Sequence, residues 1–219
     1  MRKILNVVLL CALTGMLAAC AVVSSPDRWK TVPADQSATI FGTVTTGDAI
    51  FKGVSLKFRN IQTGEEASFK TNIDATGDPE LTKDKWQPGF VYEFKVPAGD
   101  YEFFNFFGAG GNETWTARRD FSIPFRVEAG RTYYIGEYRV ESYLGKGIFV
   151  SVAQAGPYFL VIDNEKRDTE LWLKRRKEAF EGEVIKLIPK IDPANPILRT
   201  TKPAFGDLGP YGGCSGWFC

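Results

Sequence analysis

The stretch that decides the fold is Phe90–Tyr101, FVYEFKVPAGDY. Its large apolar residues occupy every second position as far as Val96, which is the spacing of a strand with one buried face. Pro97–Asp100 follows as a tight turn, because proline presets φ at the first corner and glycine accepts a positive φ. Tyr101–Phe107 then returns as a second strand, so the stretch predicts a β-hairpin.

Segments of the same kind lie on both sides of this hairpin. Pro124 indicates that the strand containing it lies at a sheet edge or carries a bulge, because proline cannot donate a ladder hydrogen bond. About nine short strands separated by turn residues predict a mainly β sandwich or barrel. The further strand segments are Ala38–Thr45, Val54–Arg59, Ala67–Thr71, Phe121–Val127, Thr132–Val140, Ile148–Val152 and Tyr158–Ile162.

Two turns carry a resemblance to a known family. Val96–Tyr101 (VPAGDY) and Val127–Tyr134 (VEAGRTYY) resemble turns of the transthyretin-like, or carboxypeptidase regulatory-like, β-sandwich, and the resemblance covers roughly residues 38–163. It implies an antiparallel Greek-key sandwich of about seven strands that is usually non-catalytic. The fold class expected for the chain is this sandwich with one C-terminal helix and an extended tail.

The N-terminus has the pattern of an export signal. Met1-Arg2-Lys3 precedes an apolar run, Ile4–Leu17, which is too short for a comfortable membrane span. Leu17-Ala18-Ala19-Cys20 resembles the lipobox of bacterial lipoproteins, which implies cleavage before Cys20 and attachment of lipid to its sulfur. Ala21, where aspartate would favour the inner membrane, implies the periplasmic face of the outer membrane in a two-membrane bacterium. The alternative is an ordinary secretory signal with an incidental cysteine.

The chain divides into five expected segments. A helix is expected after Asp168 or Thr169, ending near Gly182, and many prolines follow it. Cys214 and Cys219 are the two cysteines left in the exported chain after lipidation, and an oxidising periplasm predicts that they form a disulfide, within or between chains. The segments are a signal peptide (1–19), a tether (20–36), a β-sandwich domain (37–163), a helical appendage (164–188) and an extended proline-rich tail (189–219).

Composition excludes several classes of function. The chain has no histidine, which removes Ser-His-Asp and Cys-His catalysis and histidine-rich zinc sites. Loss of Arg2 and Lys3 takes the formal charge from +1 to −1, so no electrostatic case exists for nucleic acid. The acidic residues of the insertion at 74–88 do not have calcium-loop spacing. We therefore expect no catalytic residues, no metal and no cofactor. The sequence does not favour a hydrolase that uses carboxylates, because no paired-carboxylate motif occurs.

The aromatic residues suggest the candidate binding surface. Simple alternation places Tyr101, Phe103 and Phe107 on one face of their strand and Phe104 and Phe106 on the other. The second face then needs a cover, either the C-terminal helix, through Trp172 and Phe180, or a partner protein or apolar ligand. A disulfide in the tail would also present Trp217 and Phe218.

Together these features predict a membrane-anchored periplasmic lipoprotein that acts as a non-enzymatic binding or structural module of the cell envelope. Its partners would be the membrane, through the N-terminal lipid, and an envelope protein. The alternative is a sugar or lipid ligand in an aromatic groove that uses Trp86, Trp115 or tyrosines. A concave aromatic pocket would favour the ligand, and a flat apolar patch would favour the protein partner.

Overall fold

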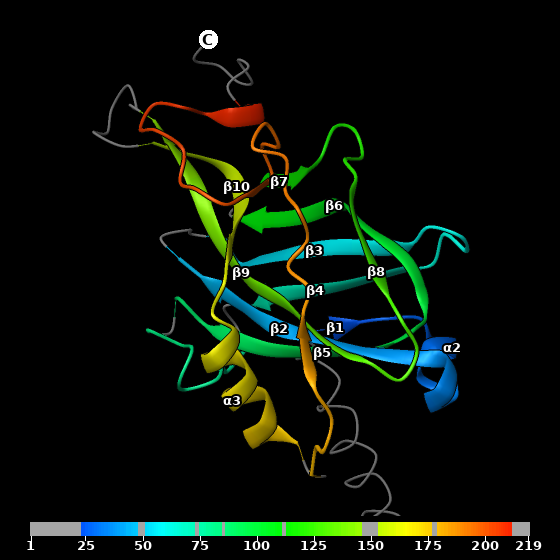
Figure 1. Ribbon diagram of the computed structural model, residues 1–219. Helices are drawn as coiled ribbons and strands as arrows, with labels where there is room; N and C mark the ends of the chain where they lie inside the picture. Colours follow the sequence, from blue (N-terminus) through cyan, green and yellow to red (C-terminus); the bar gives the residue numbers. More distant parts are fainter. Residues whose placement is uncertain are drawn as a thin grey trace, which may run out of the picture.

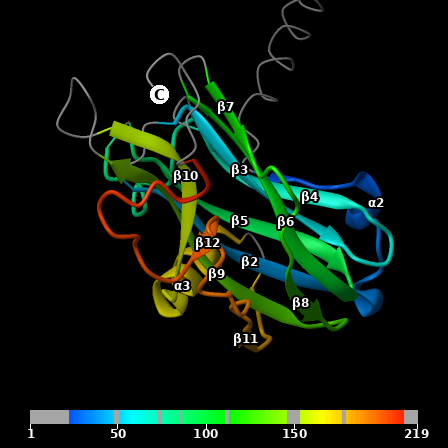
Figure 2. The same ribbon diagram turned by 90° about the horizontal axis from the view of Figure 1, so that it is seen from above.

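Two β-sheets pack face to face in the computed structural model (Figures 1 and 2). The structure describes residues 23–47, 51–72, 75–84, 86–110, 113–145, 153–176 and 179–211. The predictions of a mainly β fold, two sheets, a C-terminal helix and an extended tail are confirmed. Cys20, Cys214, Trp217, Phe218, Cys219 and the expected strand Ile148–Val152 lie outside the described residues.

The first sheet is antiparallel throughout its described pairs. Its order is β1-β4-β3-β6-β7, and β8 also pairs with β6, on a different stretch of that long strand. Pro124 lies in β8, and among the described strands β8 pairs with β6 alone. The prediction that the strand of Pro124 lies at a sheet edge is therefore confirmed. The strands are β1 Val23–Ser24, β3 Gly53–Asn60, β4 Glu66–Asn72, β6 Gly99–Gly110, β7 Glu113–Thr116 and β8 Ile123–Val127.

The second sheet is mixed, so the expectation of an antiparallel sandwich is wrong for this sheet. Its order is β12-β10-β9-β2-β5, and β11 pairs with β9. β2 runs antiparallel to β5 but parallel to β9, and the short strands β11 and β12 also join in parallel. The strands are β2 Ser37–Thr46, β5 Gly89–Pro97, β9 Thr132–Gly145, β10 Ala153–Ile162, β11 Val184–Lys186 and β12 Leu198–Arg199.

The core between the sheets is largely aromatic, and alternation along the strands fills it. Every second residue of β3 and β8 is buried, as period-two patterning requires. Phe58 lies within about 6 Å of Phe94, Phe103 and Phe125, and Phe69 stacks on Tyr92 at 4.2 Å. Such ring pairs add stability beyond the area that they bury.

A β-bulge corrects the expected faces of β6. Leu56 faces Phe106 while Phe58 faces Phe103, so β6 carries one extra residue here. The extra residue reverses the alternation beyond it. Phe106 therefore joins Phe103 in the core, and Phe107 turns outward with 42% of its surface exposed. Phe104 remains on the outer face, buried beneath the guanidinium of Arg59 at 4.4 Å.

The predicted tether at 20–36 is wrong for its described part, Val23–Gln36. β1 pairs with β4, and the helix α2, Asp27–Lys30, inserts the fully buried Trp29 into the core. The indole Nε1–H donates to Glu65 at 2.7 Å, and the ring meets Tyr101 edge-on. A short 3₁₀ turn, η2 Ala34–Gln36, leads into β2. Burial of a large aromatic side chain makes this segment part of the domain.

The C-terminal helix α3, Glu165–Arg175, covers the second sheet rather than β6 (Figure 1). Trp172 is buried and stacks on Phe41 of β2 at 4.2 Å, and Phe180 meets Trp172 edge-on. The expectation that this helix covers the outer face of β6 is therefore wrong. The tail continues through β11, β12 and a 3₁₀ turn, η3 Gly209–Tyr211, so Val184–Lys186 is a strand and not helical. In the described part of the chain, no helix is long and apolar enough to cross a membrane.

Candidate functional site: an arginine- and aromatic-lined groove

The predicted aromatic surface does not exist as a surface in the described structure. Phe104, Phe106 and Trp172 are each at most 4% exposed, and Phe180 is partly buried against Trp172. The bulge in β6 and the docking of α3 on the other sheet explain this outcome. The large apolar side chains that are exposed lie apart in the sequence, on five different segments: Ile61, Trp86, Phe107, Leu173 and Phe205.

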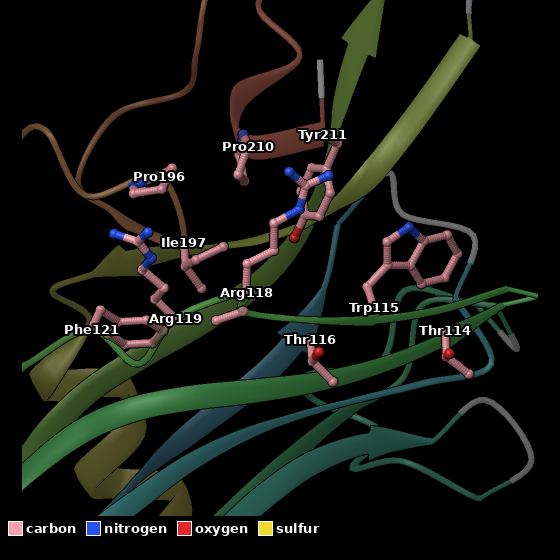
Figure 3. A pocket seen from close by; sticks show the side chains of 11 residues that line it. Thr114, Trp115, Thr116, Arg118, Arg119, Phe121, Pro196, Ile197, Pro210 and Tyr211 are labelled. Carbon is pink, nitrogen blue, oxygen red and sulfur yellow. The ribbon is translucent and has the colours of Figure 1, made fainter. Parts of the chain in front are cut away.

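A groove of about 940 Å³ lies instead between the β7–β8 connection and the tail (Figure 3). One wall comes from the first sheet and the other from residues 196–211, which run beside β10. We call this feature the arginine groove. Its described lining is Thr114, Trp115, Thr116, Ala117, Arg118, Arg119, Phe121, Pro196, Ile197, Pro210 and Tyr211.

The two arginines lie on a short arm, Ala117–Ser122, which forms because β7 and β8 pair with separate stretches of β6. Asn105 of β6 holds the arm at two points: its Nδ2 donates to Asp120 at 2.8 Å, and its Oδ1 accepts from the backbone N–H of Ala117 at 3.2 Å. Phe121 N–H donates to the carbonyl oxygen of Phe104 at 2.9 Å. These bonds fix the arm on a rigid sheet.

The arrangement leaves the groove positively charged. Asp120, next to the arginines in sequence, accepts from Arg59 at 3.1 Å and from Asn105, so its charge is engaged outside the groove. Arg118 and Arg119 are exposed and form no ion pair with a described residue. The described lining contains no carboxylate. Figure 3 shows both side chains rising from the arm toward the tail, Arg118 in the direction of Tyr211 and Arg119 in the direction of Pro196.

Contacts with neighbouring strands and loops fix the aromatic side chains that line the groove. Trp115 is partly buried and meets Phe51 edge-on at 5.0 Å. The Tyr211 hydroxyl donates to the carbonyl oxygen of Pro157 at 2.7 Å, and the ring lies so close to Gly156 that a Cβ there would clash. Burial raises the pKa of Tyr211 well above its ordinary value, so its hydroxyl stays neutral. Ring surfaces fixed in this way lose little conformational entropy when a ligand binds.

A second cluster of charge lies buried where α3 meets the second sheet, and it is structural. Arg167 donates to Glu137 at 2.7 Å and to Asp168 at 2.6 Å, and both carboxylates are fully buried. Thr43 and Tyr134 donate to the other oxygen of Asp168 at 2.8 and 2.9 Å. Donors already occupy both oxygens of this carboxylate, which favours a structural role in joining the helix to the sheet.

The pKa values of the two acids differ in direction. Burial opposes the ionised form of Glu137, but hydrogen bonds from Thr45 and Asn164 and the nearby arginines hold its pKa below the ordinary value. Burial dominates at Asp168 and raises its pKa in spite of the hydrogen bond from Arg167. The pair docks the helix and is not arranged for proton transfer.

The acidic insertion, considered above as a possible calcium site, is engaged in ion pairs with the same chain. Asp78 and Glu80 of the acidic insertion form ion pairs with Arg175 and Lys174 of α3. Among the described residues, no group of three or more potential ligands could hold a metal ion. The described part of the chain thus presents the arginine groove as its candidate binding site.

The sequence indicated Trp115 as a candidate but not the other residues that line the groove. Arg118, Arg119 and Phe121 share the segment TWTARRDF, whose adjacent arginines among aromatic residues were the available signal. Ile197 and Tyr211 lie far along the chain, and nothing in their local pattern indicates that they face Trp115. Trp86, the other tryptophan considered for a ligand groove, is exposed and does not line this one.

Comparison with known proteins assigns no family. No protein-family model and no curated protein sequence matches the chain. One solved structure with partial similarity is a leucine-rich repeat protein from Bacteroides thetaiotaomicron VPI-5482, at 11% identity and a TM-score of 0.29 over 48% of this chain. The chain spans 14% of that protein, and a similarity this low establishes neither a shared fold nor a shared function.

Proposed function

We propose that the protein is a lipid-anchored, non-enzymatic module of the cell envelope that binds a ligand in the arginine groove. The observation that carries this proposal is a concave site with fixed aromatic walls and two exposed arginines that have no ion pair with a described residue. Ligand sites of about 300–1,000 Å³ commonly combine ring surfaces with a few polar groups. These features favour a ligand bound in the groove over a protein partner docked on an aromatic patch.

The chemistry of the groove supports binding without catalysis. Its polar groups are guanidinium groups, threonine hydroxyls and a neutral phenol. A guanidinium keeps its proton in proteins, so it cannot serve as a general base. The hydroxyls have no described base in the lining to activate them. These groups can position a sugar or lipid ligand but give no means of proton transfer.

The anchor supports a location at a membrane surface. Lipid on Cys20, implied by Leu17-Ala18-Ala19-Cys20, would be attached three residues before β1. Three extended residues span about 10 Å, so the β1–β4 edge would stay close to the headgroups. Two acyl chains give stable anchoring where one gives only marginal binding. The proposal places the module at the periplasmic face of the outer membrane.

Binding is tested with the purified lipidated protein in a non-ionic detergent and a panel of envelope glycans and lipids. A ligand of the groove should change the tryptophan fluorescence of the protein, and this change should be lost in Trp115→Ala. Trp115→Ala and Arg118→Ala should both weaken its binding. Arg131→Ala is the matched control, because Arg131 is an exposed arginine in the β8–β9 turn, outside the groove. The proposal fails if no member of the panel binds, or if both groove variants bind as tightly as the unaltered protein.

The anchor has a separate test. Cys20→Ala should abolish incorporation of labelled fatty acid and release the protein from membranes, because the acylated sulfur is lost. Ala18→Ser is the control, because serine is allowed at that lipobox position and labelling should persist. Labelling of the Cys20→Ala variant would show that lipid is attached elsewhere.

A further inference from the structure

The two arginines of the groove differ in the part of the opposite wall that they face. They are consecutive residues on the arm, and Figure 3 shows Arg118 directed toward Tyr211 and Arg119 directed toward Pro196. Each guanidinium can form a bidentate, charge-assisted pair with a carboxylate or phosphate. The groove therefore offers two anion-binding positions along its length, which suits a ligand that carries more than one negative group.

The surfaces around these positions are suited to sugar rings. Trp115, Phe121 and Tyr211 supply aromatic surface, and Thr114 and Thr116 place exposed hydroxyls at the rim. Aromatic ring faces carry partial negative charge and attract the polarised C–H groups of a pyranose face. Threonine hydroxyls can both donate to and accept from sugar hydroxyls. Apolar ring contacts beside polar rim groups match the two sides of a saccharide.

We infer that the ligand of the arginine groove is an anionic saccharide, whose carboxylate or phosphate groups pair with Arg118 and Arg119 while a sugar ring packs on Trp115 and Tyr211. This inference rests on the proposed function and names its ligand class. A purely apolar acyl chain would have to lie against two exposed guanidinium groups and would leave their charges without a partner, so it fits the groove less well than an anionic ligand. A nucleic acid would need a much larger basic surface than two arginines on a near-neutral chain.

The test compares the charged and the neutral form of the same polymer. Polygalacturonate and its fully methyl-esterified form share one backbone, and the ester removes the carboxylate charge. Binding is measured by calorimetry on the full-length lipidated protein in a non-ionic detergent. A phosphomannan and its dephosphorylated form repeat the comparison for phosphate. We expect at least one charged polymer to bind at least tenfold more tightly than its neutral form, since a charge-assisted hydrogen bond contributes about that factor.

The groove variants assign the effect to its residues. Arg118→Ala and Arg119→Ala should each weaken binding of the charged polymer about tenfold or more, and added salt should weaken it further. Arg131→Ala should bind like the unaltered protein. Thermal unfolding of the three variants should match that of the unaltered protein, because all three side chains are exposed.

The outcomes separate the ligand class from the proposed function. Equal binding of the charged and neutral polymers, lost in Trp115→Ala, would overturn the anionic class and leave the groove as a binding site. If poly-glutamate bound as tightly as the charged polysaccharide, the inference that the ligand is a saccharide would be overturned. Absence of binding to both charged polymers would also overturn the inference, whereas the proposed function fails only if the whole envelope panel shows no groove-dependent binding.

Discussion

Replacing Trp29 with alanine tests whether the segment before β2 belongs to the folded domain. The indole is fully buried, meets Tyr101 edge-on at 5.8 Å and Phe58 at 6.1 Å, and donates from Nε1 to Glu65 at 2.7 Å. Glu65 also pairs with Arg28, so its charge keeps one partner in the variant. The substitution therefore removes mainly packing and leaves a cavity beside the aromatic core.

The expected loss of stability is large. Truncation of a buried tryptophan or phenylalanine to alanine costs about 3–5 kcal/mol, because a cavity adds to the lost transfer free energy. A domain of this kind has a total free energy of unfolding of about 5–15 kcal/mol. We expect the free energy of unfolding to fall by about 4 kcal/mol and the melting temperature to fall by roughly 10 °C. Trp29→Phe, which keeps a ring but loses the donor, should cost about 1–2 kcal/mol.

The assay is urea unfolding of the chain from Ala21 onward, followed by far-ultraviolet circular dichroism. Trp86→Ala is the matched control, because that tryptophan is 58% exposed and its truncation should change the free energy by less than about 1 kcal/mol. If Trp29→Ala also costs less than about 1 kcal/mol, then the segment is a tether and the burial argument is wrong.

Three further outcomes follow from the packing and the charges. Phe106→Ala should cost about 3–5 kcal/mol and Phe107→Ala less than about 1 kcal/mol in urea unfolding, and equal costs would contradict the bulge. Arg167→Ala should cost about 2–3 kcal/mol at neutral pH, less than for a fully buried pair, because the Arg167 side chain is 40% exposed and Glu137 keeps Arg139 as a partner. The deficit should shrink as acid neutralises the two buried carboxylates, and a constant deficit between neutral and acidic pH would count against this explanation. Burial raises the pKa of Tyr101 to about 12. Between about pH 10 and 12 the unfolded chain loses a proton that the folded chain keeps, so stability should fall as pH rises through that window. A free energy of unfolding that stays constant across this window would refute this.

The sequence determined the local β structure well, because strand alternation and turn chemistry act over a few residues. Phe90–Val96 forms β5 with its expected buried face, and the turn after it leads directly into β6. Gly130 has φ +70°, as the second turn requires. Pro124 lies on an edge strand for the reason that its missing N–H predicts.

The faces of β6 and the position of Trp29 could not be predicted in the same way. A bulge of one residue sends every later side chain to the other face, and no period-two pattern shows where it occurs in a run of phenylalanines. Trp29 lies in a segment without periodicity, and only contacts with Phe58 and Tyr101 make it a core residue. Both outcomes depend on neighbours that are distant in the sequence.

By itself, the sequence determined a mainly β chain without histidine, its principal hairpin and its C-terminal helix, and it predicts a lipid anchor at Cys20. Only the tertiary structure decided which aromatic side chains are buried and where a ligand could bind. The arginine groove joins Trp115 and Arg118 to Tyr211, which lies more than ninety positions along the chain. A local pattern specifies which side of a strand is apolar, but not which distant segment packs beside it. The groove therefore exists only when the tail has docked beside the second sheet.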